Sequence, residues 1–538
     1  MGRMPVGAGG RLRADAPAFR EASLRGDFLT FPGARPKPGP AERIAVPLAF
    51  FALAVSLAWT VAPWFHFGPD SSLYIATARS LASGRGYTYL GAPFTLRPPG
   101  FPLLIAPLIA WRGVDFHALH LLVASVGLLG AVALYFWLRP RMGWLMALAG
   151  VVCMWLNPAF SRQSNRVMSD IPSLALMLIC FVLDRRAAES RSWRGEALLG
   201  LAVGVACIFR SAAILMIPSI IAARLLARPP EGVPRRRKES LRLAALSAGI
   251  ASAIALSWVG YSSLSRSAGP SDQTRLHSYV TFMVRTDVGD PESALRDPVE
   301  ILSRALARGP TIARAVGRRL AHRDSDRATA EIGIVDGVWT AALGLLLLVQ
   351  LLRRREAPEI FAVASLVLLL FYTGVATRLL MPSYFVALAA LLEFLRLGAG
   401  RILPPRLATT LPAALVIGIA SYDAELRWSW EKLEKNHQLQ EQYFGALSEH
   451  LPQDARIAAF SGFAYNVFLD QPTFSLKRAI VREGVRDGLA LILDRYDVDT
   501  VVLSPERGIR REQLELELQR RAGPPQRVGS ARVWRFPR

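Results

Sequence analysis

Acidic and basic side chains that could act on a substrate stand where long apolar runs of this sequence end. The clearest pair is Asp70 and Arg97, in the stretch HFGPDSSLYIATARSLASGRGYTYLGAPFTLRPPGFP. A carboxylate at such a boundary can serve as a general base, because partial desolvation raises its pKa toward the working range. A guanidinium presents a planar fork of donors that matches phosphate oxygens, and two prolines stiffen the chain after Arg97.

Each of these two residues also has a purely structural interpretation. Asp70 follows Gly-Pro and precedes a helical pattern that stops near Gly84, so it fits the N-cap of a short helix lying on a membrane surface. Arg97 could instead extend its guanidinium to the membrane–water interface from an apolar segment. The sequence alone leaves both interpretations open.

Two further segments place ionisable groups at similar boundaries. SRQSNRVMSDIPSLALML contains Arg166 and Asp170, and Asp170 is either the cap of the helix that follows or a second carboxylate at the depth of Asp70. TRLLMPSYFV contains Arg378 between two apolar runs with almost no loop. An ionisable residue at that depth is a functional hypothesis, with extension to the interface as the alternative.

The composition predicts a polytopic α-helical membrane protein. The 538 residues are 52% hydrophobic, and the mean hydropathy is +0.28, above the usual range of soluble proteins. The net charge of +22 comes from basic residues gathered in short links between apolar runs, which indicates membrane topology and no nucleic-acid partner. The three cysteines all lie inside apolar runs, so neither a disulfide framework nor a metal motif is expected.

The apolar runs predict about eleven transmembrane helices, given that a span needs about 20 apolar residues. The expected spans are 44–64, 117–138, 142–158, 171–184, 196–209, 211–227, 242–263, 334–352, 358–376, 379–396 and 407–422. Every second link is strongly basic, as the positive-inside rule requires of cytoplasmic loops. The N-terminus is therefore expected inside, and the segments 65–116, 159–170, 264–333 and 423–538 outside.

Three regions follow from this topology. Residues 1–43 are rich in Gly, Pro and Arg and read as a disordered basic cytoplasmic tail. Residues 44–422 form the transmembrane domain, whose outer loops include a basic amphipathic stretch at 298–322 expected to be interfacial. Residues 423–538 lose the long apolar runs, and DARIAAFS, GVRDGLALILDRY, DTVVLSP and RVGSARVWRF predict a small soluble α/β domain outside the membrane.

Several familiar motifs are absent or carry little weight. The acidic triplets at 324–326 and 497–499 are common by chance and fall in segments expected outside, away from cytoplasmic nucleotide sugars. No P-loop, dinucleotide motif, histidine-rich metal cluster or Gly-x-Ser-x-Gly elbow is present, which argues against an ATP-driven pump.

Four segments in order resemble the GT-C glycosyltransferases: FGPDSSLYIATARSLASGRGY, RPPGFPLLIAPL, SNRVMSDIPSLALML and TRLLMPSYFVALAALLEF. The nearest group is the bacterial relatives of protein O-mannosyltransferase and of the lipid A aminoarabinose transferase, glycosyltransferase family 39 and its kin. The likeness covers about residues 44–400. It differs in one respect, because many relatives carry Asp-Glu where this chain has Asp70-Ser71, which puts a second acidic role or metal binding there in doubt.

The resemblance implies an enzyme that moves a sugar from a polyprenyl-phosphate carrier to an acceptor hydroxyl on the outer face, with inversion. It assigns Asp70 and Asp170 to catalysis and Arg97 and Arg378 to the donor phosphate. We also expect Arg166, which precedes Asp170, to bind that phosphate. No metal or other cofactor is assigned. One carboxylate and one or two arginines would suffice for this reaction. The phosphate is a good leaving group, so the enzyme needs a base for the acceptor hydroxyl and cations that stabilise the departing phosphate.

The implied location is the inner (plasma) membrane of the cell envelope, with the N-terminus cytoplasmic and the C-terminal domain periplasmic. Expected partners are the lipid-linked donor, membrane lipids and an acceptor that is protein, lipid or polysaccharide. A transporter or a flippase of lipid-linked sugars is the main alternative, because Arg210 stands at a break between two apolar segments. A membrane scaffold with an outer binding domain is a third interpretation, and it leaves the four ordered segments unexplained.

Overall fold

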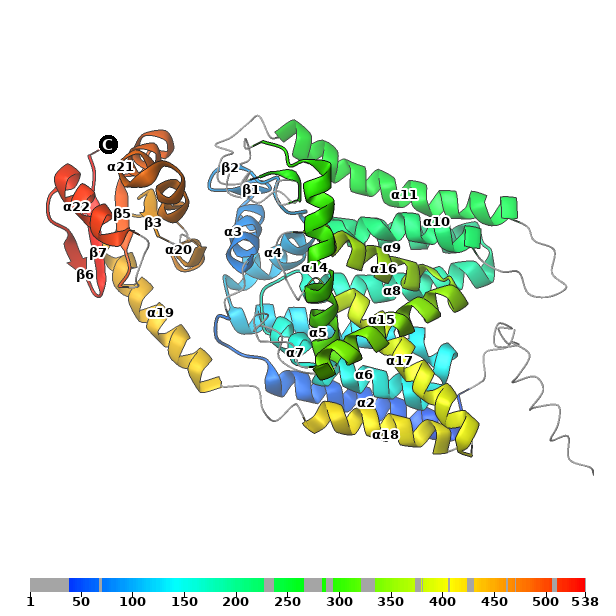
Figure 1. Ribbon diagram of the computed structural model, residues 1–538. Coiled ribbons are helices and arrows are strands. Elements are labelled where there is room, and N and C mark those ends of the chain that lie inside the picture. Colours follow the sequence, from blue (N-terminus) through cyan, green and yellow to red (C-terminus); the bar gives the residue numbers. More distant parts are fainter. Residues whose placement is uncertain are drawn as a thin grey trace, which may run out of the picture.

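The computed structural model describes residues 38–66, 70–226, 237–265, 283–286, 294–320, 334–372, 379, 381–404, 407–422, 430–460, 463–469, 471–505 and 510–537. Figure 1 shows a bundle of long helices, with a small α/β unit beyond one end of it. The predicted basic tail, apart from its last residues, and Arg378 lie outside the described residues.

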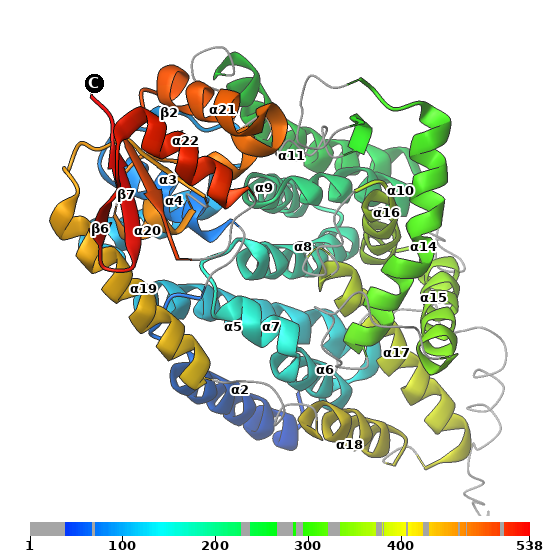
Figure 2. The same ribbon diagram turned by 60° about the vertical axis from the view of Figure 1, so that its left-hand side comes forward.

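Each predicted apolar run forms a helix, and most of these helices lie side by side in the bundle (Figures 1 and 2). They are α2 (Pro40–Thr60), α5 (Phe116–Met142), α6 (Trp144–Leu156), α8 (Asp170–Ser190), α9 (Trp193–Phe209), α10 (Met216–Leu226), α11 (Arg237–Leu264), α15 (Ile334–Arg354), α16 (Ala357–Phe371), α17 (Met381–Ile402) and α18 (Leu407–Tyr422). The protein is thus a helical multi-pass membrane protein, as its composition predicts.

Fewer than eleven of the described helices are long and apolar enough to qualify as membrane spans by these two criteria alone. Among the described residues, Pro40–Thr60, Phe116–Met142 and Lys238–Leu264 are long and apolar enough to cross a bilayer. Trp144–Leu156 and α7 (Pro158–Ser164) would together make a fourth, bent by 61°. The other apolar helices are shorter or more polar, so the count of eleven stays a prediction.

Short elements cap one end of the bundle, called here the α3 end. They are α3 (Ser71–Ala82), α4 (Gly100–Arg112) and a hairpin of β1 (Thr88–Tyr89) and β2 (Ala92–Pro93). Helix α3 begins after Asp70, as the sequence predicts, and packs on α4 through a T-shaped contact of Tyr74 with Phe101, whose ring centroids lie 5.0 Å apart. These elements close the α3 end over the buried helices.

Ion pairs hold the opposite end of the bundle together. Arg141, at the C-terminus of α5, donates to Glu359 of α16 at 2.7 Å, and both side chains are 1% exposed. Arg139 pairs with Glu42 of α2, and Arg354 pairs with Glu393 of α17. Arginines of two basic links therefore fasten neighbouring helices to one another.

The predicted interfacial stretch is one helix, α14 (Pro298–Leu320). It runs across the bundle helices and contacts α15, α16 and α17, as both views show (Figures 1 and 2). Its sequence alternates apolar residues and arginines at helical spacing, which is typical of a helix lying parallel to a membrane surface.

The C-terminal unit is a five-stranded mixed sheet with helices, in the strand order β4-β3-β5-β7-β6. Its strands are β3 (Ile457–Ala459), β4 (Thr473–Ser475), β5 (Thr500–Leu503), β6 (Gln526–Val528) and β7 (Ala531–Arg535), and its helices are α19 (Trp430–His450), α20 (Phe463–Phe468), α21 (Leu476–Tyr496) and α22 (Arg511–Ala522). The predicted last strand is in fact the β6–β7 hairpin, because Gly529 takes a positive φ of 56° and turns the chain. Strand β4 was not predicted, since TFS is too short to show an alternation.

This α/β unit is bound to the α3 end by aromatic and polar contacts. Phe468 of α20 contacts Phe65 and Phe116, with ring centroids 5.6 and 6.0 Å away. Arg79 of α3 donates to the Asn466 carbonyl at 3.0 Å, and the Asn466 amide donates to Tyr89 Oη at 2.9 Å. The sheet domain therefore rests on the segment that carries Asp70.

Candidate active site

The predicted carboxylates and Arg97 meet in one small cavity at the α3 end. Its lining comes from the start of α3, the turn before α4, the start of α8 and the end of α9. The lining residues are Asp70, Tyr74, Arg97, Pro98, Ser169, Asp170, Phe209, Arg210 and Ser211. Four segments from distant parts of the sequence thus converge on two acids and two guanidiniums.

Asp70 stands at the N-cap position of α3 but does not cap the helix with its side chain. Its Oδ1 atom lies 3.4 Å from Arg97 Nη2, and the two side chains are 12% and 9% exposed. Capping therefore does not account for the buried carboxylate. The contact is longer than a tight ion pair, for which N–O distances of about 2.7–2.9 Å are usual.

The backbone of Arg97 is held in place by the hydroxyl of Tyr87. Tyr87 Oη donates to the Arg97 carbonyl at 2.9 Å and lies 3.3 Å from the Pro98 carbonyl. Burial raises the pKa of Tyr87 well above its ordinary value, so the phenol stays a donor. The guanidinium is buried in this position and does not reach solvent as the snorkelling interpretation requires.

Asp170 forms the second pair of the cavity, with Arg210. Arg210 Nη1 lies 2.7 Å from Asp170 Oδ1, and the two side chains are 13% and 1% exposed. Arg210 ends α9 in an extended conformation, and a 3₁₀ turn (Ser211–Leu215) separates it from α10. The break in the apolar run places the guanidinium opposite the first residue of α8.

Arg210 is the residue of this site that sequence reasoning did not assign to it. The sequence marks it only as a charge at a break between two apolar segments, a feature that favours a transporter. The available signal was the depth of the charge, because an intramembrane arginine is costly and needs an anionic partner. The partner, Asp170, lies 40 residues away in the sequence and could not be identified from it.

Close packing fixes the positions of α4 and α9 around the cavity. A Cβ atom on Gly100 would lie 2.5 Å from Phe209 Cδ2 and 2.7 Å from the Ile208 carbonyl oxygen. Only glycine permits this approach, which sets Arg97 and Arg210 on the same cavity. Tyr74 Oη lies 2.9 Å from Ser169 Oγ and joins α3 to the turn before α8.

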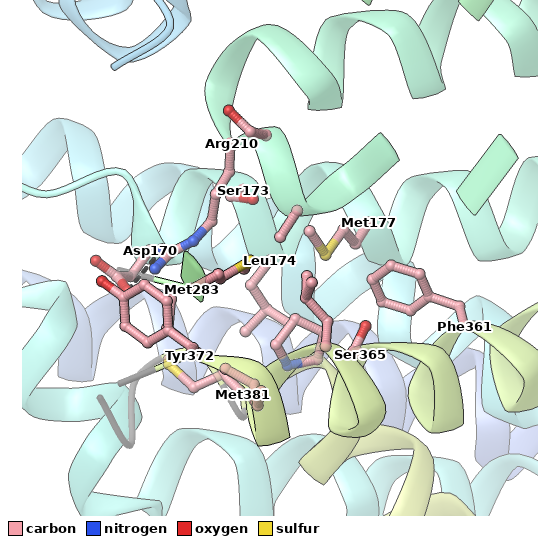
Figure 3. Close-up of a pocket in the computed structure, with 16 residues that line it drawn as sticks. Asp170, Ser173, Leu174, Met177, Arg210, Met283, Phe361, Ser365, Tyr372 and Met381 are labelled. Carbon is pink, nitrogen blue, oxygen red and sulfur yellow. Dashed lines mark hydrogen bonds and ion pairs between the residues drawn. The ribbon is translucent and has the colours of Figure 1, made fainter. Parts of the chain in front are cut away.

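A larger and mostly apolar cavity of about 160 Å³ continues from Asp170 and Arg210 into the bundle. Figure 3 shows Asp170 with Met283, Tyr372 and Met381 on one side, and Met177 with Phe361 farther away. Its lining residues are Asp170, Ser173, Leu174, Met177, Arg210, Ser211, Ala212, Met283, Phe361, Ser365, Leu368, Leu369, Tyr372, Leu379, Met381 and Pro382. An ionic end and an apolar body would suit an amphipathic ligand.

Arg166 is located outside both cavities and contacts a histidine. It donates to His66 Nε2 from Nε at 3.2 Å and from an Nη atom at 3.0 Å. Burial, followed by the charge of Arg166, lowers the pKa of His66 to about 3, so the imidazole stays neutral and accepts these bonds. The structure thus joins Asp70, Asp170 and Arg97 in one cavity, and Arg166 instead contacts His66, in the segment that precedes Asp70.

The described residues contain no group of three or more His, Cys, Asp or Glu side chains arranged to hold a metal ion. The acidic triplet that ends at Asp499 has a structural role, because Asp499 accepts from the Arg456 backbone N–H at 3.2 Å and from the Thr500 hydroxyl at 2.8 Å. The triplet at 324–326 lies outside the described residues.

Comparisons with known proteins concern the family and the fold of the chain. Residues 96–258 match the family described as dolichyl-phosphate-mannose-protein mannosyltransferase. The fold is similar to that of ArnT from Cupriavidus metallidurans bound to undecaprenyl phosphate, with a TM-score of 0.61, 13% identity, and 93% of this chain and 100% of that chain covered. The apo form of that ArnT gives a TM-score of 0.57 at 13% identity, covering 92% and 100%.

A third solved structure is more distant. It is the archaeal oligosaccharyltransferase AglB from Archaeoglobus fulgidus, in complex with an inhibitory peptide and a dolichol-phosphate, with a TM-score of 0.53 and 12% identity over 89% of this chain and 71% of that chain. No curated protein matches the chain by sequence.

The chain therefore has the fold of these membrane glycosyltransferases, and residues 96–258 resemble the dolichyl-phosphate-mannose-protein mannosyltransferase family. The sequence resemblance to bacterial relatives of protein O-mannosyltransferase and the aminoarabinose transferase is thereby confirmed.

Proposed function

We propose that this enzyme transfers a sugar from its polyprenyl-phosphate carrier to an acceptor hydroxyl at the α3 end of the bundle, with inversion at the anomeric carbon. The observation that carries the proposal is the small cavity in which Asp70, Arg97, Asp170 and Arg210 meet. It supplies a base and cations at one point, beside an apolar cavity.

Asp70 acts as the general base. Its carboxylate takes the proton of the acceptor hydroxyl while the acceptor oxygen forms a bond to the anomeric carbon. The bond from that carbon to the phosphate oxygen breaks, and its electron pair leaves on the phosphate. Attack on the face opposite the phosphate produces the inversion. The Asp70 carboxylate lies 3.4 Å from Arg97, beside a cation that would bind the phosphate.

Arg97 and Arg210 stabilise the departing phosphate. Fixed cations in a site with little water stabilise developing negative charge without reorganising during the reaction. Asp170 orients Arg210 through their 2.7 Å contact. Arg166 steadies the segment before Asp70 through His66, and Arg378 stays a predicted phosphate ligand.

The larger cavity would take apolar parts of the donor. Its wall of leucine, methionine and phenylalanine side chains begins at the Asp170–Arg210 pair. The phosphate would therefore lie at the ionic end, with the first isoprene units in the apolar body. The α3 end would be the outer face, as the basic links predict, and residues 423–538 would form a domain over it.

Sugar transfer by purified full-length protein in detergent tests the proposal. Short-chain polyprenyl-phosphate sugars are offered, and release of polyprenyl phosphate is measured. Asp70→Asn should lower the rate by about 10²-fold or more, and Arg97→Gln by a similar factor. Full turnover in Asp70→Asn would overturn the assignment of the base.

Matched controls separate chemistry from folding. Asp487→Asn removes an exposed carboxylate of α21, and Arg112→Gln removes an arginine that is 50% exposed at the end of α4. Both should keep wild-type rates. A wild-type protein that binds the donor and carries it across a vesicle membrane without hydrolysing it would instead support the transporter.

A further inference from the structure

Helix α14 presents an apolar face outward. Val299, Leu302 and Leu306 are 74%, 53% and 65% exposed, at positions i, i+3 and i+7. The opposite face packs against the bundle, with Ala305 2% and Ile312 5% exposed. In a water-facing helix the outer side would be polar, so this exposed stripe indicates contact with lipid.

Two arginines lie on the packed side of this helix. Arg304 and Arg308, one turn apart, are both partly buried and flank Ala305. Arg304 Nη2 donates to the Met283 carbonyl at 2.8 Å, and its buried Nε atom has no acceptor among the described residues. Arg304 is thus turned toward the protein, and Arg308 lies partly buried one turn away.

Among the described residues, no carboxylate forms an ion pair with either arginine. Neither arginine has an acidic oxygen within 4 Å in the described part of the chain, and the nearby Glu300 is already bound by Arg296. Burial lowers the pKa of both guanidiniums, and the charge of a neighbouring arginine, Arg296 for Arg304 and Arg304 for Arg308, adds to the effect, whereas the charge of Glu300 acts against it on Arg304. An anion between the two arginines would offset the repulsion and the cost of burial.

The pair is linked to the larger cavity. Met283, whose carbonyl accepts from Arg304, is one of its lining residues. Helix α14 also packs against α16, and Phe361, Ser365 and Tyr372, on that helix and just after it, line the same cavity. The two arginines therefore stand between a lipid-facing helix and the wall of the apolar cavity.

We infer that Arg304 and Arg308 form a second phosphate-binding site, which takes the phosphate of a membrane lipid. Residues at i and i+4 on a helix have Cβ atoms about 5–6 Å apart. At this spacing the planar guanidinium groups of Arg304 and Arg308 can bind one phosphate together. A lipid seated against Val299, Leu302 and Leu306 would carry its phosphate at the depth of the helix. The inference does not depend on the donor phosphate being bound by Arg97.

Lipid binding to the delipidated full-length protein tests the inference by native mass spectrometry. The probes are phosphatidylglycerol, polyprenyl phosphate, phosphatidylcholine and inorganic phosphate. Wild type should bind the anionic lipids at least about tenfold more tightly than phosphatidylcholine, a preference that a charge-assisted contact supplies. Arg304→Gln/Arg308→Gln should remove this preference, and Arg112→Gln should keep it.

The probes also identify the source of the phosphate. If the double variant no longer binds either anionic lipid, the site takes ordinary bilayer phospholipid. If it loses only one bound polyprenyl phosphate, the site is a second position for the polyprenyl-phosphate carrier. Displacement of lipid by inorganic phosphate would show that the headgroup alone is recognised. Arg97→Gln should remove a different polyprenyl phosphate, so failure there would contradict the proposed donor site and not this one.

Single variants keep the inference testable if the double variant does not fold. Arg308 makes no hydrogen bond to a described residue, so Arg308→Gln removes a charge and no internal contact, and it should weaken anionic lipid binding about tenfold or more. Arg308→Lys should restore part of it. Unchanged lipid preference in folded Arg308→Gln and in the double variant would overturn the inference.

Discussion

Replacing Arg210 by methionine should destabilise the protein far more than its position at a helix end suggests. The guanidinium lies 2.7 Å from Asp170 Oδ1, and the Asp170 side chain is 1% exposed. At an effective dielectric constant of about 20, charges at this distance attract by about 6 kcal/mol, part of which is offset by their desolvation. Arg210→Met leaves the carboxylate buried without this cation, and we expect a loss of about 3–5 kcal/mol.

A double-mutant cycle separates the ion pair from lost packing. Asp170→Ala should also cost about 3–5 kcal/mol, because it leaves the arginine charge buried. The double variant Asp170→Ala/Arg210→Met should cost about as much as either single variant, since it removes both charges. The measurement is the free energy of unfolding of purified protein in mixed micelles.

The exposed pair Arg112 and Asp115 provides the control. Their side chains are 50% and 34% exposed and 3.4 Å apart, so Arg112→Met should cost less than about 1 kcal/mol. Additive losses for Asp170 and Arg210, within about 0.5 kcal/mol, would show that the two groups do not interact. That result would refute the ionic pairing on which the orientation of Arg210 depends.

Three other changes probe the packing around the site. Gly100→Ala puts a Cβ 2.5 Å from Phe209 Cδ2, which should displace the end of α9 and slow sugar transfer about tenfold or more. His66→Gln should flatten the acid side of the stability curve, because the pKa of His66 is lowered to about 3; wild-type stability is complete above about pH 6.5 and falls by about 1.4 kcal/mol per pH unit toward pH 3. Tyr74→Phe removes the 2.9 Å contact with Ser169 and should cost about 1 kcal/mol in chemical unfolding.

A specific result would contradict each of these three predictions. Gly249 has nothing within 4 Å of its Cβ position, so Gly249→Ala is the control for Gly100→Ala, and equal rates in the two variants would contradict the packing argument. Melting temperatures of wild type and His66→Gln that fall in parallel from pH 7 to 5 would contradict the role of His66. An unchanged free energy of unfolding in Tyr74→Phe would show that its hydroxyl contributes no stability.

Local sequence signals predicted much of the frame of the site. Apolar runs located the bundle helices, and Gly-Pro-Asp before a helical pattern located the start of α3. Asp70, Arg97 and Asp170 share a cavity as their common position at the ends of apolar runs suggested. These predictions succeeded because burial in a membrane and helix initiation depend on residues close together in the chain.

Predictions failed where the outcome depends on a distant partner. The N-cap motif did not reveal that the Asp70 carboxylate would face Arg97, 27 residues on, in place of the helix amides. Arg210 looked like a transporter charge because its partner is on another helix. The three-residue strand β4 exists only through its pairing with β3, so no local pattern could indicate it.

The contacts that bind the sheet domain to the α3 end also set when the site can be finished during synthesis. Asn466 bonds Tyr89 across 377 residues of sequence. At about 5–20 residues per second, Asn466 is made roughly 20–75 s after Tyr89. The segment that carries Asp70 therefore spends this interval without its final support, and a chain truncated before α20 would never gain that support.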